Sequence, residues 1–346
     1  MLKKIFLGAF AGILILSAGG ALYLYLAVNA DIDEKFAGTC EAVPLAGSGE
    51  DIQVDRDSGY AYLSMLDRLG VAQGLEIDPG MVMRIDLNDP GRPVVPALLD
   101  GPELHPHGLS LYRGNDGKLQ LFVINHPKDR ANGSEALERY TETSDGLFAH
   151  AETYASPLIT RANDMVAVGP RQFYVAQDVD RQSGDTVTDL VYFNGSDYAV
   201  IANDIQSGGG INVSADGSTL YISETGGKRI RVAERNPNGT LVNERFIQLD
   251  TSPDNIDVAA DGSLWVGGHS NVIALAMHFI AGSNAPSQIL RIDAQSEPAQ
   301  IEEIYLNAGD EISAGSGGAT FGDTLLIGSI TARKVLACTM DDTDDA

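Results

Sequence analysis

The chain has 346 residues and a formal net charge of −25, because 48 Asp and Glu outnumber 23 Lys and Arg. This length fits two average domains or one large β architecture, and a hydrophobic content of 44% is enough for a sizeable core. No cluster of Lys and Arg interrupts the acidic composition. A nucleic-acid partner is therefore excluded, since phosphate binding needs such clusters.

A long uncharged segment follows the first lysines. Lys3 and Lys4 precede residues 5–28, a run of 24 residues without a charge. At about 1.5 Å per residue a helix of this length crosses a bilayer, and the run exceeds the apolar part of a cleaved signal. We therefore expect residues 1–30 to form an uncleaved transmembrane signal anchor, with the rest of the chain outside the cytoplasm, in the periplasm or extracellular space. Cleavage after Ala30, which would release a secreted protein, is the alternative.

The chain has only two cysteines, Cys40 and Cys338, at opposite ends of the part that follows the anchor. In an oxidising compartment this placement indicates one disulfide that ties the two ends together. Two unpaired buried thiols are the alternative. The residues after Cys338 are acidic, and we expect 341–346 to form a disordered tail.

Two stretches in the middle of the chain repeat the same pattern. Residues 211–223 (INVSADGSTLYIS) and 256–268 (IDVAADGSLWVGG) both read as a strand, an Asp-Gly turn and a second strand. Their aspartates, Asp216 and Asp261, are 45 residues apart, a spacing suited to the four strands of one propeller blade. Almost no helical pattern occurs between the cysteines.

Four weaker copies complete the series, with turns near residues 57, 116, 170 and 323. Six units of about fifty residues lie within the usual range for propeller blades. We therefore predict an all-β fold over residues 31–340, a six-bladed β-propeller whose first and last blades are joined by the cysteines. A β-sandwich and an open repeat array are the competing folds.

Polar residues recur at one position of these units. Counting back seven residues from the turn reaches Glu50, Asn163, Gly209, Asp254 and Ser316 in five of the units. Three of these positions begin a polar pair: Glu50–Asp51, Asn163–Asp164 and Asp254–Asn255. Equivalent positions on the innermost strands of a propeller converge on the central channel. Carboxylate and amide oxygens gathered there would suit Ca²⁺, and without a cation they would repel one another. A single pair would be explained by a turn, but three pairs in register favour a metal site.

The histidines suggest acid–base chemistry near the same channel. His107 lies at the register position of the second unit, and His126 ends the second strand of that unit. His269 ends the equivalent strand of the fifth unit. We expect His107 and His126 to lie side by side as a general base and its orienting partner.

These stretches resemble the serum paraoxonase/arylesterase family of calcium-dependent lactonases. The similarity covers GSGEDIQV, HPHGLSLY, LFVINHP, ANDMVAVGPRQFYVAQD, GINVSADGSTLYISE, DNIDVAADGSLWVGGH, SQILRI and ITARKVLAC, from the first cysteine region to the second. The family has a six-bladed propeller, two calcium ions, a retained hydrophobic N-terminus and a disulfide between its ends.

The resemblance implies a role for individual residues. The catalytic calcium would be held by Glu50, Asn163, Asp254 and Asn255, and the structural calcium by Asp51, Asp164 and the backbone carbonyl of Leu109. His107 would be the general base, His126 its partner, and Asp254 a further proton acceptor. The substrate pocket would include His269, Ser316 and Ile330. The implied activity is hydrolysis of lactones, with aryl esters as a second class of substrate.

The chain departs from the family at two places. Gly209 stands where the family has an asparagine that binds the catalytic calcium, and the loop between Leu66 and Pro79 shows no match. Water, Asp204 or Ser207 could replace the missing oxygen. A membrane-anchored binding propeller with structural calcium is therefore kept as an alternative function, and a sugar-lactonase-like enzyme as another.

Overall fold

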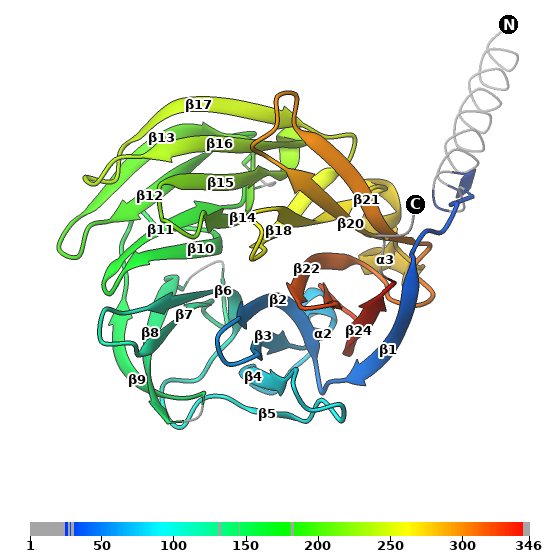
Figure 1. Cartoon of the computed structure of the whole chain (residues 1–346), viewed down its shortest axis with the longest axis horizontal. Coiled ribbons are helices and arrows are strands. Elements are labelled where there is room, and N and C mark those ends of the chain that lie inside the picture. The colour runs from blue at the N-terminus through cyan, green and yellow to red at the C-terminus, as the bar shows by residue number, and fades with distance from the viewer. Residues whose placement is uncertain are drawn as a thin grey trace, which may run out of the picture.

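The computed structural model describes residues 25, 26, 28, 31–130, 133–144, 146–180 and 183–341. Within this part of the chain, 24 strands form six four-stranded antiparallel sheets arranged around a central axis (Figure 1). The all-β six-bladed propeller is therefore confirmed. The sandwich and the open array are excluded, because each innermost strand contacts the innermost strands of both neighbouring sheets.

Each sheet is one blade, and its strands follow one another outward from the axis. Blade 1 contains β2 (Ser48–Asp55), β3 (Tyr60–Leu66), β4 (Met81–Asp86) and β5 (Val94–Pro96). Blade 2 contains β6 (Pro106–Arg113), β7 (Leu119–Asn125), β8 (Ala136–Ser144) and β9 (Leu147–Tyr154). Blade 3 contains β10 (Ala162–Gly169), β11 (Gln172–Gln177), β12 (Thr188–Phe193) and β13 (Tyr198–Ile205).

The second half of the ring repeats this order. Blade 4 contains β14 (Gly208–Val213), β15 (Thr219–Glu224), β16 (Arg229–Arg235) and β17 (Leu241–Gln248). Blade 5 contains β18 (Ser252–Val258), β19 (Leu264–His269), β20 (Ser287–Asp293) and β21 (Gln300–Asn307). Blade 6 contains β22 (Gly315–Phe321), β23 (Thr324–Ser329), β24 (Lys334–Met340) and, as its outermost strand, β1 (Gly38–Pro44). All six predicted turns lie between the first and second strands of their blades.

The ring closes in blade 6, where the two ends of the chain share one sheet. Strand β1 pairs antiparallel with β24, and Cys40 lies opposite Cys338 in that pairing. The two cysteines form the predicted disulfide. The first strand of the propeller is thereby bonded covalently to the last.

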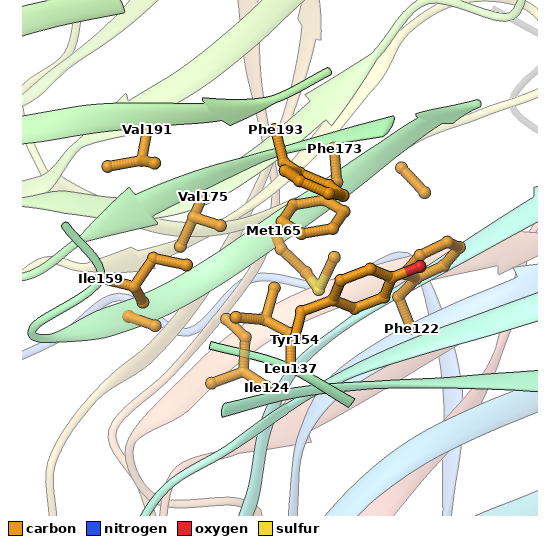
Figure 2. Close-up of a cluster of buried hydrophobic side chains, with 12 residues drawn as sticks. Phe122, Ile124, Leu137, Tyr154, Ile159, Met165, Phe173, Val175, Val191 and Phe193 are labelled. Atoms are coloured by element: carbon orange, nitrogen blue, oxygen red, sulfur yellow. The ribbon is translucent and has the colours of Figure 1, made fainter. Parts of the chain in front are cut away.

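Apolar side chains fill the space between neighbouring blades. Each of the six blade-to-blade interfaces has its own buried cluster within the described residues. Figure 2 shows the cluster between blades 2 and 3, where Phe122, Met165 and Phe173 pack with Tyr154 and Phe193. Alternate residues of a strand face opposite sides of its sheet, so each blade presents one apolar face to each neighbour.

The innermost strands are irregular at the positions that the sequence singled out. Each has a shift of pairing register, and these shifts fall at Glu50–Asp51, His107–Gly108, Asn163, Gly209–Gly210, Asp254–Asn255 and Ser316. A β-bulge leaves residues unpaired and turns their side chains away from the regular alternation. Six bulges at one level of the ring therefore direct these residues toward one end of the tunnel.

Polar groups also bridge every pair of neighbouring innermost strands. In each case a side chain of one strand bonds to the backbone of the other: Asp51 to Leu109, Ser110 to Ala167, Asp164 to Ile211, Asn212 to Ile256, Asp257 to Thr320 and Ser316 to Glu50. Backbone groups buried in the tunnel need such partners. The polar residues of the tunnel therefore hold the blades together in addition to any other role.

Helices occur where the sequence pattern indicated almost none. Between the cysteines the structure has α2 (Arg68–Ala72), the 3₁₀ turn η1 (Thr225–Gly227) and α3 (Val272–Ala281). The α3 segment lies between two strands of a repeated unit, and we did not predict it, although both of its ends carry ordinary helix-capping residues. The Asn271 side chain accepts from the Ala274 amide at its start, and Gly282 adopts a left-handed conformation at its end.

The predicted anchor, residues 1–30, lies outside the described residues except for 25, 26 and 28. The helices that the structure does describe are all too short or too polar to cross a membrane. Of the predicted tail 341–346, only Asp341 is described.

Candidate active site

Residues from four blades meet where the innermost strands begin. The bulges place Glu50, His107, Asn163 and Asp254 at this end of the tunnel. His126 lies here because it follows the last residue of β7, and in antiparallel strands the end of the second lies beside the start of the first. The predicted register therefore describes a real spatial cluster.

Glu50 is the most enclosed acid of this cluster, with only 3% of its surface exposed. Its Oε1 accepts from the Asn255 Nδ2 at 2.8 Å, and the same amide donates to the Glu50 backbone carbonyl at 3.1 Å. Its Oε2 is buried and has no hydrogen-bond partner. This Oε2 lies 3.8 Å from the Arg68 Nη2 and 3.5 Å from the His107 Nε2.

Asp254 lies on the facing strand and is 8% exposed. Its Oδ2 is 3.0 Å from the His269 Nε2, so His269 is a direct neighbour of this carboxylate. Asn163 is half-buried in the bulge of β10. The structure thus gathers two carboxylates, Glu50 and Asp254, with the amide-bearing residues Asn163 and Asn255.

A second pair of acids lies beneath this cluster. Asp51 and Asp164 are each 2% exposed. Asp51 Oδ2 accepts from the Leu109 amide at 2.5 Å, and Asp164 accepts from the amides of Ile211 at 2.8 Å and Met165 at 2.7 Å. Burial, with the nearby Glu50 charge, raises the pKa of Asp51 to about 7. Burial and the Asp51 charge raise the pKa of Asp164 well above its usual range.

These donor sets fit a hard cation. Within the described ranges, no three Asp, Glu, His or Cys side chains are grouped as a metal site. However, the expected ligands include amide and backbone oxygens, which Ca²⁺ accepts as readily as carboxylates. The partnerless Oε2 of Glu50 and the mutual repulsion of Asp51 and Asp164 are both relieved by a cation.

The two predicted catalytic histidines are neighbours. The ring centroids of His107 and His126 are 4.9 Å apart. Nδ1 of His107 and Nε2 of His126 are both buried without a hydrogen-bond partner, whereas Nδ1 of His126 is 2.5 Å from the Glu135 Oε2. Burial lowers the pKa of His107 to about 3 and that of His126 well below its usual range. Both rings are therefore neutral at pH 7 and able to accept a proton.

A large pocket opens next to Glu135, the neighbour of His126, and neither His107 nor His126 is among its lining residues. It measures about 1320 Å³ and is lined by Glu135, Arg161, Phe279 and Ile330, among others. Ile330 lines this pocket, and its contact with a substrate stays a prediction. Ser316 is fully buried, and its hydroxyl donates to the Glu50 carbonyl at 2.5 Å, so it supports the strand that carries Glu50. Contact of His269 or Ser316 with a substrate stays a prediction.

The sequence suggested that Asp204 or Ser207 replaces the oxygen missing at Gly209, but the residue beside Gly209 in the structure is Thr225. A Cβ built on Gly209 lies 2.6 Å from Thr225 Oγ1 and 3.5 Å from Asp254 Oδ1. Asp204 is instead paired with Arg231, and the Ser207 hydroxyl donates to Asp178. Thr225 therefore occupies the space of the missing side chain, and its hydroxyl donates to the Pro253 carbonyl at 2.7 Å.

Two charged residues at the site were missed. Arg68 opens α2 directly after β3, and its guanidinium donates to the Pro106 carbonyl at 2.7 Å, next to His107. Glu135 precedes β8 and contacts His126. Arg68 follows β3 and Glu135 precedes β8, at the end of the propeller where the site lies, but neither is seven residues before a blade turn. Their sequence positions could have been noticed only because each is a charged residue next to a buried strand.

Known proteins match this chain over most of its length. The arylesterase family model matches residues 59–340. Serum paraoxonase/arylesterase 1 from Homo sapiens is 30% identical over 308 residues, which cover 84% of this chain and 85% of the relative. Serum paraoxonase/lactonase 3 from Mus musculus is 29% identical over 313 residues, covering 85% and 86%.

Solved structures share the fold at low identity. A luciferin-regenerating enzyme has a TM-score of 0.54 at 14% identity, covering 87% of this chain and 95% of its own. A putative gluconolactonase has a TM-score of 0.52 at 14% identity, covering 88% and 94%. Regucalcin from Agrobacterium tumefaciens, described as a calcium-binding protein, has a TM-score of 0.51 at 14% identity, covering 88% and 96%. At 14% identity, the similarity to these structures shows only that this chain shares their fold.

Proposed function

The chain belongs to the arylesterase family, and we propose that it is a calcium-dependent hydrolase of lactones, with aryl esters as a second class of substrate. The observation that carries this proposal is the cluster at the tunnel end, where the buried, partnerless Oε2 of Glu50 lies 3.5 Å from a neutral histidine. Relatives whose names include arylesterase and lactonase, matched over most of their length, support ester hydrolysis as the reaction.

We assign two calcium ions to the two acid clusters. The catalytic ion would be held by Glu50, Asn163, Asp254 and Asn255, and the structural ion by Asp51, Asp164 and the Leu109 carbonyl. When bound at the first cluster, Ca²⁺ supplies a Lewis acid that polarises the ester carbonyl. Regucalcin, which shares the fold at 14% identity, shows only that one protein with this fold is described as calcium-binding.

The histidine pair supplies the acid–base chemistry. Burial lowers the pKa of His107, so its ring is neutral at pH 7, and Nε2 is the atom to which we assign the proton of the attacking water. His126 lies against the His107 ring and orients it. Asp254 is a second candidate acceptor, but its Oδ2 is already engaged by His269 at 3.0 Å. The pocket next to Glu135, bounded also by Ile330, is where we place the substrate.

We also propose that residues 1–30 anchor the propeller to a membrane, outside the cytoplasm. The disulfide between Cys40 and Cys338 supports an oxidising compartment. Alkaline extraction of membranes, followed by protease treatment of spheroplasts, tests this placement. A propeller that stays protected in intact spheroplasts but is digested after their lysis would overturn it.

A panel of lactones and aryl esters, assayed with and without calcium, tests the function. We expect turnover with calcium, loss of turnover after chelation, and recovery when calcium is restored. Full activity after verified removal of the metal would contradict the proposal. His107→Gln should lower kcat by roughly 10²–10⁴-fold, the usual contribution of general base catalysis, with little change in melting temperature.

One observation favours a different function, a binding propeller in which calcium serves only the structure. Gly209 removes a side-chain oxygen from the first cluster, and Thr225 fills its place. If the calcium-replete chain hydrolyses nothing in the panel, this function becomes the better explanation. The third alternative, a sugar-lactonase-like enzyme, shares the fold, but the His107–His126 pair argues against it.

A further inference from the structure

The His126 ring is held on its far side by a buried carboxylate that the proposed mechanism does not use. Glu135 is only 2% exposed, and its Oε2 lies 2.5 Å from Nδ1 of His126. Its other oxygen, Oε1, accepts from Arg130 Nε at 2.8 Å. Arg130 in turn donates from Nη2 to the Ala162 carbonyl at 2.9 Å, which ties the group to the start of β10. Both oxygens of Glu135 are thus fixed.

These contacts determine which nitrogen of His126 carries the proton. A carboxylate only accepts hydrogen bonds, so His126 donates its Nδ1 proton to Glu135. Its Nε2 then carries the lone pair. That atom is buried without a partner, as is Nδ1 of the neighbouring His107. The two nitrogens do not hydrogen-bond to each other in this arrangement, and a rotation of the adjacent rings would bring them within reach of one shared proton.

We propose that Glu135 is a positioning residue for hydrolysis, which sets the His126 tautomer and completes a Glu135–His126–His107 relay anchored by Arg130. This inference rests on the proposed function. Burial raises the pKa of Glu135, and Arg130 opposes that shift, which favours the ionised carboxylate that the relay needs.

The relay balances as a proton transfer in two directions. Water gives a proton to Nε2 of His107, whose Nδ1 proton moves to Nε2 of His126. The resulting positive charge is stabilised by Glu135, as a carboxylate does for the histidine of a serine protease. The water oxygen bonds to the ester carbonyl carbon. When the carbonyl carbon–oxygen bond to the leaving alkoxide breaks, the proton returns along the same path to that oxygen.

Glu135→Gln isolates the positioning role, because it keeps the shape of the side chain. The glutamine oxygen can still accept from Arg130, which turns the amide NH₂ toward His126. His126 must then accept at Nδ1 and carry its proton on Nε2, facing His107. The relay would be blocked by a change of tautomer, with no loss of packing.

The same blade provides a matched control. Glu138 on β8 is also 2% exposed and lies 2.8 Å from a histidine, His150, through its Oε2. Glu138→Gln therefore makes the same chemical change at an equally buried Glu–His pair outside the relay. Glu135→Asp, which keeps the carboxylate, tests rescue.

Two measurements on the full, calcium-loaded chain decide the inference. Long-range ¹H–¹⁵N correlation spectra of ¹⁵N-histidine protein, assigned with His126→Gln, should show His126 as the Nδ1–H tautomer in wild type and Nε2–H in Glu135→Gln. The kcat for a hydrolysed lactone should fall by about 10²-fold in Glu135→Gln with little change in KM. It should stay within about twofold in Glu138→Gln and recover in part in Glu135→Asp.

An Nε2–H tautomer in wild type, or equal kcat in the two glutamine variants, would overturn the relay. The proposed function fails separately. If wild type hydrolyses no lactone or ester, the function is wrong while the spectra still report the tautomer. If His107→Gln abolishes turnover but Glu135→Gln does not, the function stands and the relay falls.

Discussion

Replacing Asp51 by Asn should stabilise the propeller when calcium is absent and reduce the stabilisation that calcium provides. Asp51 and Asp164 are each 2% exposed, and the Asp51 charge adds to burial in raising the pKa of Asp164. The Asp51 Oδ2 accepts from the Leu109 amide at 2.5 Å, a bond that the Asn oxygen can also make. Asp51→Asn therefore removes a buried negative charge and keeps the bridge between blades 1 and 2.

The magnitude follows from the pKa of Asp51, which burial raises from 3.8 to about 7. One pKa unit corresponds to about 1.4 kcal/mol, so at neutral pH the metal-free protein is destabilised by up to roughly 4 kcal/mol. The folded state holds the proton longer than the unfolded state, so stability in chelator falls as pH rises from about 4 to about 7. Calcium at about 100 times its Kd would return about 2.7 kcal/mol to wild type.

Urea denaturation at pH 7.5, in chelator and in excess calcium, measures both effects. We expect Asp51→Asn to be more stable than wild type in chelator by roughly 2–4 kcal/mol, and to gain less from calcium. Asp257→Asn is the matched control, because Asp257 is 5% exposed and its Oδ2 is 2.5 Å from Arg56. Asp257 lies outside both acid clusters, so this variant should change stability by the same amount in chelator and in calcium. An equal loss of stability for Asp51→Asn in chelator and in calcium would refute the destabilising role of the buried Asp51 charge.

Two further predictions concern ring closure and the first acid cluster. Reduction of the Cys40–Cys338 bond opens a loop of 298 residues, which the chain-entropy model values at about 5–6 kcal/mol as an upper limit. The urea midpoint should fall in reductant, and an unchanged midpoint after verified reduction would contradict the closing role of the bond. Gly209→Asn places a Cβ 2.6 Å from Thr225 Oγ1 and should cost about 1–3 kcal/mol in thermal denaturation. Combined with Thr225→Ala it should raise calcium affinity by about tenfold, measured by calorimetry; an unchanged affinity would show that no ligand is missing.

Most of the fold could be predicted because its determinants are local. The Asp-Gly turns at Asp216 and Asp261 each form within four residues, so their sequence signature does not depend on the rest of the fold. The register of Glu50, Asn163 and Asp254 relative to these turns was also visible. The turn and the bulge belong to the same strand, so a fixed count of residues separates them. Convergence on the tunnel then followed from the symmetry of the ring.

The remaining parts of the site depend on contacts between blades and loops. Arg68, in blade 1, donates to the carbonyl of Pro106 in the neighbouring blade 2. Thr225, which lies outside the innermost strand, fills the space of the missing side chain at Gly209. Glu135 lies outside the repeat, on the approach to the third strand of its blade. None of these residues shares a spacing with the turns, so no periodic pattern could select them.

The sequence by itself determined the number of blades, the residues that open each innermost strand, and the two cysteines that join the ends. These features follow from interactions over a few residues, which the order of side chains along a strand specifies. Only the tertiary structure decided that the acid pairs bridge neighbouring blades and that Glu135 lies against Nδ1 of His126. Such pairings depend on how strands distant in sequence are brought together, and closure of the ring sets those distances.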